Sequence, residues 1–187
     1  MIEVFNRISA RQIKAIMQHT QWADMFDFLG LMGEKRWQEY RAIDEFAEMR
    51  GLHRYALNHC NKLILNSTTE AVNEIPTSWY NYTRLDVDNE TRKTYVKRIY
   101  EDWYKWEKET KEFLEEQFKI LTDNKQIASA DKVNCLIQGV DQELKRLTRK
   151  MLEYRAVNYD LDYIMYCQPE MHEHFKEKTK DIGISIC

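Results

Sequence analysis

The chain has 187 residues, of which 43% are hydrophobic and 32% charged, and its formal net charge is −3. This length suits one domain of ordinary size. A small net negative charge excludes the strongly basic surface that duplex nucleic acid requires, so we expect no nucleic-acid partner. Only five glycines and two prolines occur, which excludes a turn-rich β-sandwich and favours an all-α fold.

The cysteines and the N-terminal segment exclude several other classes. The four cysteines form no CxxC pair, so neither a zinc knuckle nor a thioredoxin-type site is indicated. The sequence MIEVFNRISARQIK lacks the apolar core of a signal peptide. Apolar runs are too short to cross a bilayer, so we expect no membrane contact and a soluble, cytoplasmic protein with free thiols.

Two N-terminal segments are predicted to be helical. The first begins after Ser9, a suitable N-cap, and ends near Met32. Its expected core stripe is Ile13, Ile16, Met17, Thr20, Ala23, Asp24, Asp27, Phe28 and Leu31. The second covers about residues 36–65, after a tight turn near Gly33. Because only this turn separates the two helices, we expect an antiparallel hairpin.

Residues 66–89 have no helical period and contain Pro76 with several Ser, Thr and Asn. A connection of this length can run the whole length of a helical bundle. We therefore predict a long crossover around Ile75–Val87. Trp79 and Tyr80 are predicted to pack against the bundle, because aromatic side chains bury a large apolar area at low entropic cost.

Helical periods return in residues 90–122 and 130–157, and a tail with a break at Pro169 follows. We predict a single helical domain over 1–187, with a four-helix bundle at 9–157 and a helical tail at 158–187. The predicted chain forms two hairpins, joined by one long crossover between the second and third helices. This is the connectivity of ferritin-like bundles.

Each of the four long helices places one acid inside its apolar stripe. The acids are Asp24, Glu45 (or its neighbour Asp44), Glu107 and Glu143. Counting about 1.5 Å per residue from the predicted turns puts all four at a similar depth in the bundle. Because carboxylates cost much free energy when buried unpaired, their convergence requires protonation, cationic side chains or metal.

Residues 10–157 resemble the ferritin-like superfamily. The stretch WEKETKEFLEEQFKIL is similar to a ferritin third helix, with Glu107 at the place of a metal-ligating Glu. The stretch DKVNCLIQGVDQELKRL is similar to a fourth helix, with Glu143 at the corresponding acidic position. His53 would match the second-helix histidine. The resemblance implies bound iron or manganese, which hard oxygen ligands favour.

The ExxH motifs of that superfamily are not kept. If His53 is a ligand, Arg50 stands where Glu is expected, and if Glu143 begins the other motif, Arg146 stands where His is expected. A cation at these positions opposes a metal pair. We therefore predict that Arg50 and Arg146 neutralise the acids, with Arg41 as a further candidate. The alternative is simple surface pairing, of Glu107 with Lys111 and of Glu143 with Arg146 or Lys150.

Two functions follow from these patterns. The first is a non-catalytic ferritin-like bundle, without a cofactor, that acts as an accessory or protein-interaction module with a second copy of the chain or another protein as partner. The alternative is a carboxylate-bridged di-iron or manganese protein. Its metal ligands would be Asp24, Glu45, His53, Glu107 and Glu143. No Ser-His-Asp or Cys-His constellation or phosphate loop is present, which weighs against an enzyme.

Overall fold

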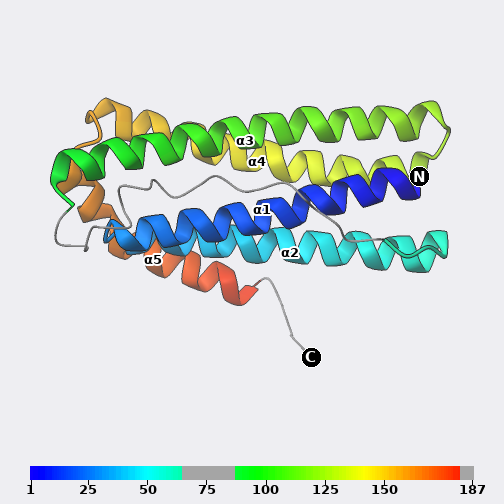
Figure 1. Cartoon of the computed structure of the whole chain (residues 1–187), viewed down its shortest axis with the longest axis horizontal. Helices are drawn as coiled ribbons and strands as arrows, with labels where there is room; N and C mark the ends of the chain where they lie inside the picture. The colour runs from blue at the N-terminus through cyan, green and yellow to red at the C-terminus, as the bar shows by residue number, and fades with distance from the viewer. Residues whose placement is uncertain (65–86, 182–187) are drawn as a thin grey trace.

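The computed structural model describes residues 1–64 and 87–181, and this part of the chain is all helical, as predicted. Four of its helices are long and lie side by side, and a fifth lies against them (Figure 1). The helices are α1 (Ile2–Phe28), α2 (Met32–Cys60), α3 (Asn89–Asp123), α4 (Ile127–Ala156) and α5 (Leu161–Asp181). Within the described ranges, none is long and apolar enough to cross a membrane.

The four long helices form two antiparallel hairpins, α1 with α2 and α3 with α4. The first turn uses Gly30 at φ +79°, and the second uses Lys125 at φ +58°. α2 ends at the opposite end of the bundle from the start of α3 (Figure 1), as expected for a ferritin-like order of helices. This confirms the predicted topology. Trp79 and Tyr80 lie outside the described residues, so their packing stays a prediction.

α1 begins at Ile2, earlier than the predicted start after Ser9. Ser9 is fully buried inside the helix and does not cap it. The reason is that Val4, Phe5 and Ile8 continue the buried face of α1 toward the N-terminus, and each is at most 4% exposed. Packing of this extra stretch outweighs the local capping preference of Ser9.

Two apolar clusters fill the interior. The aromatic cluster lies near the first turn and includes Trp22, Phe26, Trp37, Tyr100, Trp103, Tyr154 and Phe175. The aliphatic cluster lies toward the N-terminus of α1 and includes Val4, Phe5, Ile8, Leu52, Leu114, Leu121, Val133 and Leu136. On α3, buried Glu107 lies between Trp103 of the aromatic cluster and Leu114 of the aliphatic cluster. A polar layer therefore separates the two clusters.

α5 continues through Pro169, so the predicted break there is wrong. The helix is held beside α2 by Gln168, whose Oε1 accepts from the backbone N–H groups of Gly33 at 2.9 Å and Glu34 at 3.2 Å. A Cβ on Gly33 would lie 2.6 Å from the Gln168 carbonyl oxygen, so the close approach requires glycine. Phe175 stacks on Trp37 at 5.1 Å, which anchors the far end of α5.

Candidate functional site

Three of the predicted acids converge in the polar layer between the two clusters. Glu45 on α2, Glu107 on α3 and Glu143 on α4 are 7%, 1% and 0% exposed. We call these three residues the carboxylate layer. Each stands in a stripe of buried residues on its helix, which is why sequence periodicity located them.

Arg41, one turn before Glu45 on α2, faces all three acids. Its Nη2 donates to Glu45 Oε1 at 2.8 Å and lies 3.7 Å from Glu107 Oε1. Its Nε lies 3.8 Å from Glu143 Oε1. Its Nη1 donates to Asp44 at 2.7 Å. A single buried guanidinium therefore serves as the shared counterion of the layer.

α1 contributes His19 to the layer, and the prediction that Asp24 points inward is wrong. Asp24 is exposed, whereas His19 is fully buried. The His19 Nδ1 lies 2.8 Å from Gln38 Oε1, and its Nε2 lies 3.8 Å from Glu107 Oε1. The sequence did not indicate His19, because the buried face of α1 carries several polar residues. The hydrophobic pattern therefore did not identify which face of this helix is buried.

The other predicted residues lie in three different surroundings. His53 is half-buried and its Nε2 lies 2.9 Å from Ser9 Oγ. It is two turns beyond Glu45 on α2, roughly 12 Å along the axis. Arg50 is exposed, so its predicted role in neutralising the layer is wrong, and Arg41 has that role. Arg146 sits at the rim and donates to Glu143 Oε2 at 3.1 Å.

The alternative of simple surface pairing holds only for Glu143. Lys111 donates to Asp141 of α4 at 2.7 Å, so it does not pair with Glu107. Instead, Glu107 Oε1 accepts from the indole Nε1 of Trp103 at 3.0 Å. Glu143 does pair with Arg146, as expected from their spacing. Lys150 bonds to Glu153 at 3.0 Å.

Burial dominates the electrostatics of the layer. Burial raises the pKa of Glu45 and of Glu107 to about 8, although Arg41 opposes the shift in both. Burial, together with the charge of Arg41, lowers the pKa of His19 to about 3, so this imidazole is neutral. At neutral pH the layer therefore retains protons that the same carboxyl groups would lose in water.

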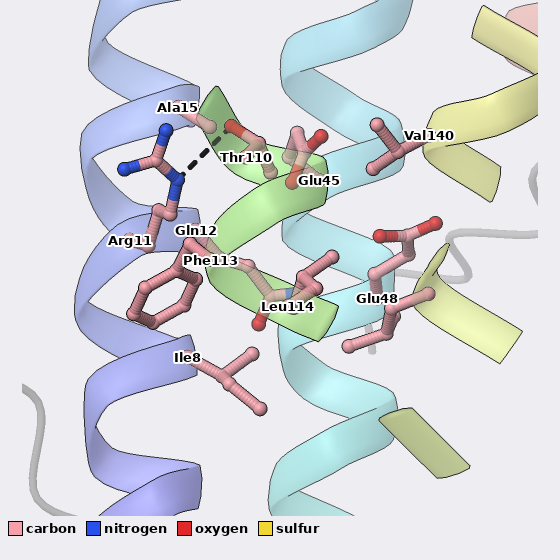
Figure 2. A pocket seen from close by; sticks show the side chains of 11 residues that line it. Ile8, Arg11, Gln12, Ala15, Glu45, Glu48, Thr110, Phe113, Leu114 and Val140 are labelled. Carbon is pink, nitrogen blue, oxygen red and sulfur yellow. Dashed lines mark hydrogen bonds between the residues drawn. The ribbon is translucent and has the colours of Figure 1, made fainter. Parts of the chain in front are cut away.

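Several buried polar atoms in the layer lack a hydrogen-bond partner among the described residues. They include Glu107 Oε2, Glu143 Oε1, His19 Nε2 and Arg41 Nε. Buried polar groups are almost always paired in folded proteins, so such atoms mark a place where a ligand or water belongs. A cavity of about 20 Å³ adjoins the layer at Glu45 (Figure 2).

A second buried acid, Glu34, lies in the aromatic cluster. It is fully buried and accepts hydrogen bonds from the hydroxyl of Tyr100 at 2.6 Å and from that of Tyr154. Burial raises the pKa of Glu34, against the effect of these hydrogen bonds. No sequence signal identified this group, because its partners come from two helices that are remote in the chain.

A pair of metal ions does not fit the carboxylate layer. Arg41 stands within 3.8 Å of an oxygen of all three acids and takes the space between them. In the described part of the chain, no three His, Cys, Asp or Glu residues are placed to hold one ion together. Glu107 Oε2 and Glu143 Oε1 nevertheless accept no hydrogen bond from the described residues.

Comparison with known proteins identifies the fold. No family model matches the sequence, and no curated protein matches it significantly. Among solved structures, an engineered closed form of the Archaeoglobus fulgidus ferritin is 17% identical, with a TM-score of 0.73, and the match covers 92% of this chain and 94% of that one. A humanized archaeal ferritin is 14% identical, with a TM-score of 0.75 over the same shares.

A novel open-pore ferritin from the hyperthermophilic archaeon Archaeoglobus fulgidus is 17% identical, with a TM-score of 0.73 over 92% of this chain and 95% of that one. Matches that cover nearly the whole of both chains show that this protein has the ferritin-like fold. The predicted resemblance is thereby confirmed at the level of the fold.

Proposed function

We propose that this protein binds one divalent metal cation, Fe(II) or Mn(II), at the carboxylate layer. The observation that carries the proposal is the convergence of three buried carboxylates from three helices, two of which have an oxygen that accepts no hydrogen bond from the described residues. Hard oxygen ligands suit these two ions. The similarity to ferritins supports this function over the interaction-module alternative.

One ion per chain is expected, because Arg41 already supplies one positive charge inside the layer. Glu45, Glu107 and Glu143 carry three potential negative charges against the single guanidinium that they surround. Arg146 adds only a partial contribution, since its side chain is 46% exposed. The negative charge that Arg41 leaves uncompensated in the layer is enough to balance one divalent cation and too small to balance two.

Binding should release protons. The pKa of Glu45 and that of Glu107 are raised to about 8, so both groups are mostly protonated at neutral pH. A cation needs them ionised, and affinity should therefore increase as the pH rises toward 8. A bound cation would supply charge compensation to the layer, while Arg41 and Trp103 hold the carboxylates of Glu45 and Glu107 in place.

The proposal is tested by thermal unfolding of untagged, metal-free protein under anaerobic conditions, with and without Fe(II) or Mn(II). A ligand that binds only the folded state raises the melting temperature. Glu107→Gln should abolish the increase, because the amide cannot carry negative charge. Glu112→Gln is the matched control, since Glu112 lies exposed on the same helix.

If neither metal changes the melting temperature of the folded wild-type protein, the proposed function is wrong. The layer would then be a salt-bridge network around Arg41, and the accessory or interaction-module function would be favoured. In that case a second copy of the chain is the first partner to test, by measuring the molar mass in solution.

A further inference from the structure

A surface pocket lies at one end of the bundle, where α3 begins beside the point at which α4 gives way to α5 (Figure 1). Its volume of about 510 Å³ falls within the range of about 300–1,000 Å³ that is usual for small-molecule sites. The lining comes from one face of α3 and from the end of α4 with the turn that follows it. The pocket shares no residue with the carboxylate layer.

Basic side chains gather around this pocket. Lys93 and Lys97 stand one turn apart on α3, and Arg155 comes from the last turn of α4. Among the described residues, neither lysine takes part in an ion pair. Arg155 Nη2 lies 3.8 Å from Glu101 Oε1, too far for a hydrogen bond. Glu90 is the other acid of the lining, so three positive charges face two negative ones, and the excess positive charge favours an anion.

Tyr159 adds a buried hydroxyl to the lining. The residue is 4% exposed, and its ring packs against that of Tyr154 with 6.1 Å between the ring centres. Its Oη has no hydrogen-bond partner among the described residues. Because a buried polar group without a partner is unfavourable, this hydroxyl indicates that a ligand binds here.

The backbone around Tyr159 has an uncommon conformation. Asn158 and Tyr159 have φ angles of 51° and 53°, in the left-handed region that bulky residues rarely adopt. The turn is closed by the N–H of Tyr159, which donates to the carbonyl oxygen of Tyr154 at 2.7 Å. Burial raises the pKa of Tyr159, and the nearby guanidinium of Arg155 opposes this shift. Since the Arg155 side chain is 54% exposed, an anion can draw it outward and reach the hydroxyl.

We infer that this pocket binds a phosphate group. Lys93, Lys97 and Arg155 compensate its charge, and the Tyr159 hydroxyl donates a hydrogen bond to one of its oxygens. A phosphomonoester carries about two negative charges and three acceptor oxygens, which match the cationic donors of the lining. The volume of the pocket leaves room for an organic group beside the phosphate. The inference does not depend on a cation in the carboxylate layer.

The test is calorimetric titration of the full-length protein with inorganic phosphate and with phenyl phosphate, in EDTA so that no metal-bound phosphate contributes. Lys97→Gln and Tyr159→Phe should each weaken binding by about tenfold or more, as expected for the loss of one hydrogen bond to a charged group. Glu101→Gln should strengthen binding, because it removes a negative charge from the lining. Lys105→Gln is the matched control and should bind as the wild-type protein does, since Lys105 is exposed on the same helix outside the pocket.

The two probes distinguish the two sources of a phosphate group. Tighter binding of phenyl phosphate assigns the pocket to a phosphomonoester, and tighter binding of inorganic phosphate assigns it to the free ion. No saturable binding of either probe overturns the inference, and so does binding that Lys97→Gln leaves unchanged. An equal loss in Lys105→Gln also overturns it, because only the net charge would then matter. Should Tyr159→Phe fail to fold, Lys97→Gln decides, because Lys97 is exposed.

Discussion

Glu107→Gln should make the metal-free protein more stable at neutral pH, although it removes a group that faces Arg41. The sign follows from the protonation of Glu107. Its pKa is raised from 4.5 to about 8 in the folded state, so the folded protein holds a proton that the unfolded chain has lost. The stability of the wild-type protein therefore falls as the pH rises from about 4.5 to about 8.

The size of the effect follows from the same shift. Each pKa unit is worth about 1.4 kcal/mol, so at pH 7 the carboxyl of Glu107 costs the fold about 3 kcal/mol. Glutamine has no proton to lose and keeps an oxygen that can accept from Trp103 Nε1. The variant should therefore gain up to about 3 kcal/mol at pH 7, reduced by its lost attraction to Arg41, and nothing at pH 4.

Urea unfolding followed by tryptophan fluorescence, in EDTA and at several pH values between 4 and 8.5, measures this difference. The slope of unfolding free energy against pH should be less negative in Glu107→Gln by up to about 1.4 kcal/mol per pH unit. Glu112→Gln is the control and should follow the wild-type profile. Parallel profiles for Glu107→Gln and wild type would refute the assignment of a retained proton to Glu107.

Three further variants test the packing. Arg41→Met should lower the unfolding free energy by about 3–5 kcal/mol at pH 8.5, and by less at pH 5, where the acids are protonated. Urea unfolding that gives the same loss of unfolding free energy at the two pH values would contradict this. Tyr154→Phe removes a donor to buried Glu34 and should cost about 1–3 kcal/mol, whereas an unchanged urea midpoint would show the bond to be unimportant. Gln168→Leu leaves the N–H of Gly33 unpaired and should speed hydrogen exchange throughout α5; wild-type protection there would argue against this docking.

Much of the fold could be predicted because it depends on local patterns. Helical periodicity, two short turns and one long aperiodic stretch between residues 66 and 89 define the topology. Glu107 and Glu143 were located correctly because their neighbours at helical spacing are apolar and buried, among them Trp103 and Leu147. The helix ends were less accurate, since packing of Val4 and Phe5 extends α1 beyond its expected cap.

The α1 side of the site could not be predicted because its buried face is partly polar. Gln12, Gln18 and His19 are all at most 6% exposed, while Met17, taken for a core residue, is 46% exposed. The hydrophobic pattern therefore pointed to the wrong face and to Asp24. The pairing of Arg41 with Glu45 follows from their spacing, but its contact with two other helices is a tertiary feature.

Calorimetric titration of metal-free protein with Mn(II) at pH 7.5, in two buffers of different ionisation enthalpy, tests the central claim most directly. We expect one ion per chain, accompanied by the release of protons from the layer, because Glu45 and Glu107 are mostly protonated beforehand. Two ions per chain, no binding, or binding without proton release would contradict the account.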